Sequence, residues 1–247
     1  MFVPTPATVG PWDPQLQHGS PLAALIATCV EEMPGPGRIA HLALDFLGPV
    51  NVEPLEVETT IVRPGKRIEL VSGVVKRGER ALLRATVWRT AQGPVITTGA
   101  ARRGVVVPPP LPASANVALF PNVPRFGYGE SLEWRFVSGG FDVLGPATVW
   151  SRLLVPIVDE EPVSQAARLL AMVDSANGIS AEIDLRAYLF VPVTLTVSIA
   201  REPVGEWMGM SARTMLAGGT GGTTHAMLFD SVGTFGEALQ TLYVEKR

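Results

Sequence analysis

The chain has 247 residues, of which 47% are apolar and 17% are charged, and its formal net charge is −3. This balance excludes a disordered chain and predicts one or two packed domains. The 25 glycines and 22 prolines indicate many turns, which argues against a helical bundle. The single cysteine, Cys29, excludes a disulfide framework, and the lack of a basic stripe argues against nucleic acid as a partner.

The N-terminal sequence has neither the charged region nor the apolar region of a signal peptide. Its longest apolar stretches fall short of the ~20 residues that a membrane-spanning helix needs. We therefore expect a cytoplasmic protein with no membrane span.

The first predicted element is a helix over residues 22–33. Ser20 suits its N-cap and Pro21 suits its first turn. Apolar residues recur at helical spacing until Pro34-Gly-Pro-Gly37 ends the helix. Four strands are then predicted from β-like runs between turn signals. They cover residues 39–50, 56–62, 67–76 and 80–89.

A proline-rich stretch, Val105–Asn116, interrupts the chain near its middle and contains three consecutive prolines. Proline fixes φ and lacks an amide hydrogen, so this stretch can form neither a helix nor a central strand. We expect an extended linker over residues 105–127, between an N-terminal unit of residues 1–104 and a C-terminal unit of residues 128–247.

After the linker the order of elements repeats. Apolar residues at helical spacing predict a helix over about residues 164–177. Four strands are predicted to follow, over residues 190–200, 208–215, 223–229 and 235–244. Because each half alone would leave one sheet face uncovered, the two halves are expected to pack together. The predicted fold class is α+β, with both helices buried against one continuous antiparallel sheet.

Several segments, in this order along the chain, resemble the double-hotdog acyl-CoA thioesterases, which are relatives of the bacterial type II acyl-CoA thioesterases. The segments include His18-Gly-Ser-Pro-Leu-Ala-Ala-Leu25, Asp174-Ser-Ala-Asn-Gly178, Arg201-Glu-Pro-Val-Gly-Glu-Trp207 and Leu239-Gln-Thr-Leu-Tyr-Val244. The resemblance covers nearly the whole chain apart from the linker. It implies a tandem (double) hotdog fold, in which two long helices are each wrapped by an antiparallel sheet, together with an acyl-CoA substrate and a homo-oligomer, commonly a dimer. No cofactor is expected.

The resemblance also implies a catalytic trio of an Asp, a Thr or Ser, and a Gln. Carried over position by position, the Gln is Gln240 and the hydroxyl is Thr214, with Ser211 as its alternative. Gln240 and Thr214 are expected to hold the attacking water. The Asp position is occupied by Thr194. Because the Asp would orient or deprotonate the water, its replacement predicts slow hydrolysis that Thr194→Asp would restore. For Gln240 and Thr214, ordinary strand positions are the alternative reading.

Asp174 lies near the end of the second predicted helix, where the helix dipole disfavours a carboxylate. It fits either a polar helix end closed by Asn177-Gly178 or a general base whose pKa is raised by burial. Backbone amides near Gly19-Ser20 and Asn177-Gly178 are candidate donors to a thioester carbonyl. At Gly19-Ser20 the alternative is a simple helix cap, and at His18 a ligand contact competes with a solvated loop position.

The sequence therefore predicts an acyl-CoA thioesterase that hydrolyses a fatty acyl-CoA to free acid and CoA. A non-catalytic acyl-CoA or acyl-lipid binding protein is the alternative. A hydratase of this fold would need a paired Asp and His in one strand-to-helix segment, and neither half offers such a pair. The histidines His18, His41 and His225 share no metal-ligand spacing, which argues against a metal site.

Overall fold

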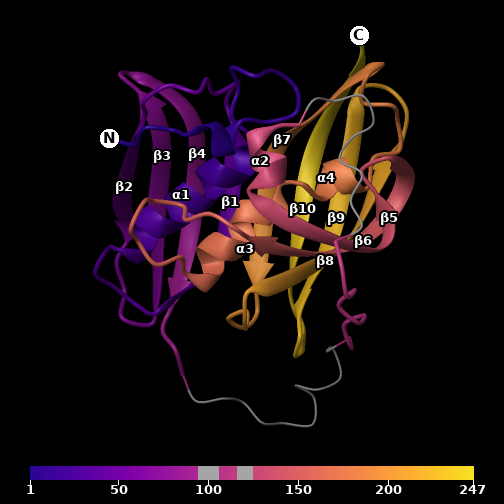
Figure 1. The fold of residues 1–247 in the computed structure, drawn as a ribbon. Coiled ribbons are helices and arrows are strands. Elements are labelled where there is room, and N and C mark those ends of the chain that lie inside the picture. The colour runs from indigo at the N-terminus through magenta and orange to yellow at the C-terminus, as the bar shows by residue number, and fades with distance from the viewer. Residues whose placement is uncertain (94–105, 116–124) are drawn as a thin grey trace.

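The fold is built on one antiparallel sheet, which the computed structural model in Figure 1 shows. The structure describes residues 1–93, 106–115 and 125–247. Within these residues the sheet has ten strands in the order β2-β3-β4-β1-β7-β10-β9-β8-β6-β5. The strands are β1 (Arg38–Phe46), β2 (Glu56–Arg63), β3 (Ile68–Arg77), β4 (Arg80–Thr90), β5 (Leu132–Gly140), β6 (Val143–Leu153), β7 (Tyr188–Ile199), β8 (Trp207–Leu216), β9 (Gly221–Asp230) and β10 (Gly233–Lys246).

The two halves of the chain meet where β1 pairs with β7 in the middle of the sheet. Leu44 lies opposite Leu195, and Leu42 lies opposite Val197. All four side chains are buried. Since side chains alternate between the two faces of a strand, this register turns apolar residues of both halves toward the same interior. One hydrophobic cluster consequently contains residues from both halves.

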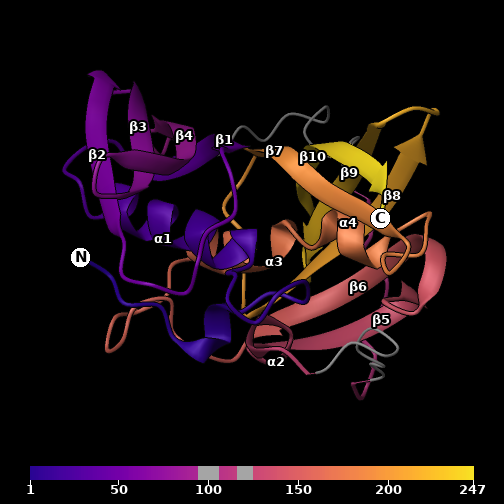
Figure 2. The same cartoon turned by 90° about the horizontal axis from the view of Figure 1, so that it is seen from above.

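The helices lie on the inner side of the curled sheet, as Figure 2 shows. The two main helices, α1 (Gly19–Glu31) and α3 (Gln165–Val173), run antiparallel, so the start of each lies beside the end of the other. The Ser164 hydroxyl donates to Glu31 Oε2 at 2.5 Å at one junction, and His18 Nδ1 lies 3.6 Å from Asp174 Oδ2 at the other. The shorter helices are α2 (Gly127–Glu130) and α4 (Ala176–Ile179), with a 3-10 helix at Pro6–Thr8. None of the helices within the described ranges is long and apolar enough to cross a membrane.

The eight predicted strands are confirmed, with shifts of up to four residues at their ends. The strands β5 and β6 were not predicted from the sequence. In this hairpin Gly139 and Gly145 have φ values of +71° and +105°, and the register between the two strands shifts twice. These irregularities disturb the alternation of apolar and polar residues from which strands are predicted.

The expectation of one continuous antiparallel sheet is confirmed, whereas two long helices, each wrapped by its own sheet, are found only in part. α3 ends at Val173 with Asp174 as its C-cap, so the predicted helix over 164–177 is interrupted before α4. The first helix also begins differently from the prediction. His18, rather than Ser20, is its N-cap, because His18 Nδ1 accepts the hydrogen bond from the Ser20 amide at 3.1 Å.

Residues 106–115 of the predicted linker contain neither helix nor strand. They lie along the β5–β6 hairpin, where Arg135 Nη1 donates to the Pro112 carbonyl at 2.8 Å and Trp150 Nε1 donates to the Pro109 carbonyl at 3.2 Å. Residues 105 and 116–124 of that linker lie outside the described residues. The division into units 1–104 and 128–247 remains a prediction.

Candidate active site

The side chain of Asp174 occupies the centre of a junction between the two halves. Asp174 follows directly on α3 and is only 4% exposed. Gln240 on β10 donates from Nε2 to Asp174 Oδ1 at 2.9 Å and to the Asp174 carbonyl at 3.0 Å. Gln240 Oε1 in turn accepts from the Asn177 amide at 3.0 Å. The amide of Gln240 therefore fixes both the carboxylate and the turn that joins α3 to α4.

The environment of Asp174 makes its carboxyl a group that titrates near neutral pH. Burial raises its pKa from 3.8 to about 7, and the hydrogen bond from Gln240 opposes that rise. A carboxyl with this pKa is well matched to proton transfer near neutral pH, because both of its protonation states are populated there.

The imidazole of His18 lies beside this carboxyl but forms no ion pair with it at neutral pH. Burial lowers the pKa of His18 to about 3, so the ring is neutral. Since Nδ1 accepts a hydrogen bond from the Ser20 amide, the hydrogen-bond pattern assigns the ring proton to Nε2. The expectation that no His–Asp pair exists was based on each half alone. The structure nevertheless places His18 of the first half beside Asp174 of the second half, with 3.6 Å between Nδ1 and Oδ2.

Tyr128, which the sequence reading did not single out, holds the same junction together. Its ring stacks on the His18 ring, with 3.8 Å between the ring centroids and 10° between the planes. Its hydroxyl donates to the Ala171 carbonyl at 3.0 Å and lies 2.6 Å from Ser175 Oγ and 3.2 Å from Ser20 Oγ. No motif marks Tyr128 in the sequence, because its partners come from two distant helices.

Gly19 lies where the backbone of α1 comes closest to the carboxyl. A Cβ atom at this position would lie 2.5 Å from Asp174 Oδ2 and 2.5 Å from Cε1 of Phe46. Only glycine fits without displacing one of them. Gly19 is also the first residue of α1, where backbone amides have no partner within the helix. Its backbone N–H is therefore a candidate donor to a developing oxyanion.

A row of polar side chains crosses β8, β9 and β10 beneath α4. Thr214 lies opposite Thr224, and Thr224 lies opposite Gln240. The Thr214 hydroxyl is 2.7 Å from Thr224 Oγ1 and 3.0 Å from Ser180 Oγ. Thr214 thus supports the α4 segment that carries Asn177 and does not contact Asp174 through a hydrogen bond. The alternative residue, Ser211, bonds instead to Thr148 at 3.0 Å.

Thr194 lies outside this group. In the pairing of β7 with β10, Leu195 is opposite Gln240, while Thr194 is opposite the exposed Thr241. Adjacent residues of a strand face opposite sides, so Leu195 and Gln240 share the inner face and Thr194 takes the outer one. Its hydroxyl accepts from the Thr241 amide at 3.3 Å.

A pocket of about 560 Å³ opens onto Asp174 from between the two halves. We call it the Asp174 pocket. The predicted residues His18, Gly19, Asp174, Asn177 and Gly178 line it. Ser20, Thr194, Thr214 and Gln240 do not. The rest of the wall is mostly apolar and includes the aromatic residues Trp12, Phe46, Phe126, Tyr128, Trp134 and Phe141. Among the described residues, no group of His, Cys, Asp and Glu has an arrangement suited to a metal ion.

Two family models match the chain. The acyl-CoA thioesterase N-terminal domain matches residues 8–90, and the acyl-CoA thioesterase C-terminal domain matches residues 107–244. No curated protein matches at a significant level.

Among solved structures, a hotdog-fold protein of unknown function from Alicyclobacillus acidocaldarius is similar at 17% identity and a TM-score of 0.77. The match covers 98% of this chain and 90% of that protein. The acyl-CoA thioesterase II TesB2 from Mycobacterium marinum is similar at 15% identity and a TM-score of 0.69, over 97% and 95% of the two chains. At these identities the likeness shows the fold. Because the C-terminal domain model alone covers more than half of the sequence, the chain belongs to the acyl-CoA thioesterase family.

Proposed function

We propose that the protein hydrolyses acyl-CoA thioesters in the Asp174 pocket, with Asp174 as the general base. The observation that carries this proposal is the Asp174 carboxyl itself. It is buried and lines an apolar pocket, and its pKa of about 7 suits it to accept a proton from water. Gln240 occupies Oδ1, which leaves Oδ2 on the side of Gly19 and His18.

In the proposed reaction, Asp174 Oδ2 removes a proton from a water molecule as the water oxygen bonds to the thioester carbon. The carbonyl electron pair moves onto oxygen, where the Gly19 N–H and the Nε2–H of His18 are the available donors. When the carbonyl re-forms, the carbon–sulfur bond breaks and the CoA sulfur leaves with the electron pair. The proton on Asp174 then passes to that sulfur, and the products are the free acid and CoA.

Gln240, which the family resemblance implies as a catalytic residue, remains part of the proposed site but has a different role there. Gln240 positions the base instead of holding the water, because its amide is already bonded to Asp174 and Asn177. Asp174 takes over the function that the resemblance assigns to the position of Thr194. Hydrolysis therefore does not require an Asp at position 194.

The test is release of free CoA from a panel of acyl-CoAs by the native chain and by Asp174→Asn. We expect the loss of a general base to lower kcat by about 10²–10⁴-fold. Asp45→Asn is the matched control, since Asp45 is an exposed carboxylate on β1 that does not line the pocket. Unchanged turnover in Asp174→Asn would contradict the assignment. Binding of acyl-CoA without turnover by the native chain would favour the non-catalytic binding protein.

A second candidate function is hydration of a 2-enoyl thioester, which the adjacency of His18 and Asp174 favours. Here water adds its oxygen to the β-carbon, and a proton is added to the α-carbon while the thioester stays intact. Crotonyl-CoA separates the two reactions. Both reactions remove the absorbance of the conjugated enoyl thioester, but hydrolysis releases one free thiol for each chromophore lost, whereas hydration releases none.

A further inference from the structure

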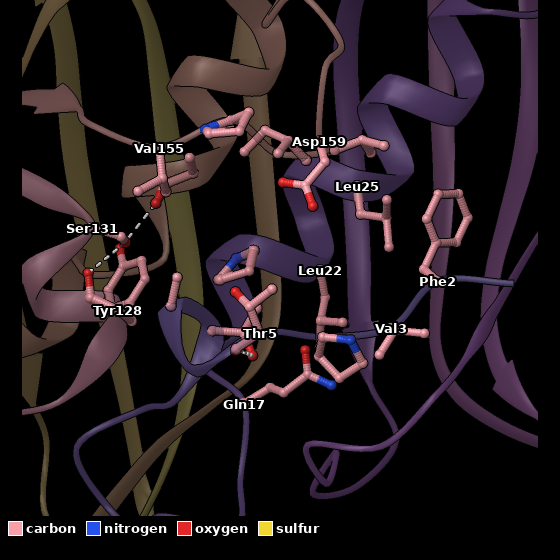
Figure 3. A pocket seen from close by; sticks show the side chains of 18 of the residues that line it. Phe2, Val3, Thr5, Gln17, Leu22, Leu25, Tyr128, Ser131, Val155 and Asp159 are labelled. Carbon is pink, nitrogen blue, oxygen red and sulfur yellow. Dashed lines mark hydrogen bonds between the residues drawn. The ribbon is translucent and has the colours of Figure 1, made fainter.

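A second cavity, of about 510 Å³, lies along α1 next to the Asp174 pocket. Figure 3 shows it from close by, with Phe2 and Val3 on one side, Leu22 and Leu25 along the helix, and Tyr128 and Ser131 on the other side. The loop residues Val155 and Asp159 complete its wall. We call this space the Leu25 cavity.

The Leu25 cavity and the Asp174 pocket share three lining residues, Gln17, Leu22 and Tyr128. Two of these are tethered by polar contacts. Gln17 Nε2 donates to the Asn51 carbonyl at 2.8 Å, and the Tyr128 hydroxyl is held by residues of α1 and α3. Leu22 has only an apolar side chain. It is therefore the part of the shared wall that can change rotamer without breaking a hydrogen bond.

The positions of the lining residues along α1 show how the two spaces follow one another along the helix. Gly19, Leu22 and Leu25 follow at three-residue intervals, which places them along one side of the helix. Gly19 lines only the Asp174 pocket, Leu22 lines both spaces, and Leu25 lines only the second. With a rise of 1.5 Å per residue, Leu25 lies about 9 Å along the helix axis from Gly19. A track along α1 thus leads from the proposed reaction centre into the Leu25 cavity.

The chemistry of the cavity suits a hydrocarbon chain. Its deep wall is formed by buried apolar residues, Leu22, Leu25, Leu55 and Ala171. Among the described lining residues, the charged groups are the side chain of Asp159 and the α-amino group of Met1, and both residues are exposed. An apolar interior with charges only at exposed positions favours the methyl end of a chain over a carboxylate or phosphate.

We propose that the Leu25 cavity binds the far end of a long acyl chain whose thioester lies beside Asp174, with Leu22 as the residue that separates the two spaces. This inference rests on the proposed thioesterase function and names long-chain acyl-CoA as its substrate class. A short acyl chain ends within the Asp174 pocket, whereas a long chain displaces Leu22 and continues into the cavity.

The experiment fills the cavity from two walls that lie away from the Asp174 pocket. Val155→Trp alters the loop, and Ala7→Trp alters the N-terminal segment. For each variant, kcat/KM is measured with hexadecanoyl-CoA and with butanoyl-CoA. We expect a decrease of at least about ten-fold for hexadecanoyl-CoA and a change within about two-fold for butanoyl-CoA. Val232→Trp adds the same ring at an exposed turn outside both spaces and is the control.

Equal losses on both substrates in well-folded variants, or no loss on either, would overturn the proposal. A native chain that hydrolyses neither substrate contradicts the proposed function but not the cavity assignment. In that case, calorimetric binding of the thioethers S-hexadecyl-CoA and S-butyl-CoA decides the matter. The assignment stands if Val155→Trp weakens binding of the hexadecyl compound alone, and it fails if the two compounds are affected alike.

Discussion

At the scale of single residues, the burial that suits the Asp174 carboxyl to proton transfer also lowers the free energy of unfolding when the carboxyl is ionised. Its folded-state pKa of about 7 lies above the ordinary value of 3.8. The unfolded chain therefore loses this proton at lower pH than the folded chain does. Between pH 4 and 7 the folded state loses stability as the pH rises, and above pH 7 the penalty is complete, at roughly 4 kcal/mol.

Asp174→Asn should consequently stabilise the protein while it removes activity. The Asn side chain is neutral at every pH, and its carbonyl oxygen can still accept the hydrogen bond from Gln240. We expect a higher Tm than that of the native chain at pH 8, with the difference shrinking as the pH falls toward 4. Thermal unfolding across this range measures it. A difference that grows toward low pH would show that Asp174 is charged in the fold at low pH.

Gln240→Leu should move the pH dependence of hydrolysis. The hydrogen bond from Gln240 lowers the pKa of Asp174, so its removal raises that pKa further above its ordinary value. The midpoint of the kcat/KM profile is then expected at higher pH. Thr214→Val is the control, because the Thr214 hydroxyl bonds to Ser180 and Thr224 and not to Asp174. A general loss of packing would lower the rate without moving the midpoint.

Thr194→Asp should not raise the rate of hydrolysis. The side chain at this position lies on the face of β7 that points away from Gln240, and Asp45 on β1 is its direct partner across the strands. Like charges directly opposite each other destabilise a sheet. We expect unchanged kcat and a small loss of stability. A gain of about 10² or more in kcat would instead indicate that the general base belongs at position 194.

At the scale of elements, the end of α1 depends on a buried ion pair. Arg89 on β4 and Glu69 on β3 are both buried and bonded to each other. Arg89 Nη1 also donates to the carbonyls of Val30 at 3.1 Å and Met33 at 2.7 Å. Its Nη2 donates to the carbonyl of Pro34 at 2.9 Å. A single guanidinium thus bonds three carbonyls at the end of α1 and in the turn that follows it.

Arg89→Met should destabilise the protein by about 3–5 kcal/mol, because it leaves the Glu69 carboxylate buried without a counterion. The double variant with Glu69→Leu should recover part of this loss, since it removes the stranded charge but not the unpaired carbonyls. Urea denaturation of the two single variants and the double variant gives the coupling. A double variant as unstable as the sum of the two single variants would contradict this account.

Local sequence signals predict the elements whose pattern is regular. The alternating runs of β1–β4 and β7–β10 and the apolar stripe of α1 were all recognisable. The β5–β6 hairpin was not, because the glycines at 139 and 145 and the register shifts interrupt its alternation. The cap of α1 was misassigned for another reason. The sequence shows that Ser20 could cap the helix, but not that Tyr128 would lie next to its hydroxyl.

At the scale of the whole molecule, the candidate site exists only because the two main helices are antiparallel. This arrangement brings His18 and Gly19 at the start of α1 against Asp174 at the end of α3. Residues more than 150 positions apart give no spacing signal, so reading each half separately could find Asp174 and His18 but not their pairing. The positions of Gln240 and Asp174 were both predicted, whereas the hydrogen bond that joins them follows from tertiary packing.

The same antiparallel arrangement creates a second junction, where the start of α3 meets the end of α1. There Ser164 caps α3 by accepting from the Ala167 amide at 3.0 Å, and its hydroxyl donates to Glu31. Burial raises the pKa of Glu31, and the hydrogen bond from Ser164 opposes that rise. The two junctions therefore share a plan in which a carboxyl at one helix end meets the start of the other helix. Only the first has the glycine and the adjacent aromatic pocket that the proposed reaction uses.

Small substitutions at the two junctions should therefore have different consequences. Gly19→Ala places a methyl group where Asp174 Oδ2 and the Phe46 ring now lie. A displacement of about 1 Å at a reacting group costs on the order of 10²-fold in rate, so we expect hydrolysis to fall by at least that factor. Ser164→Ala removes a helix cap and should lower the free energy of unfolding by about 1 kcal/mol, with kcat unchanged. Turnover and urea denaturation, measured on both variants, separate the two effects. If Ser164→Ala abolished hydrolysis and Gly19→Ala did not, the reaction would have to be placed at the second junction, beside Glu31.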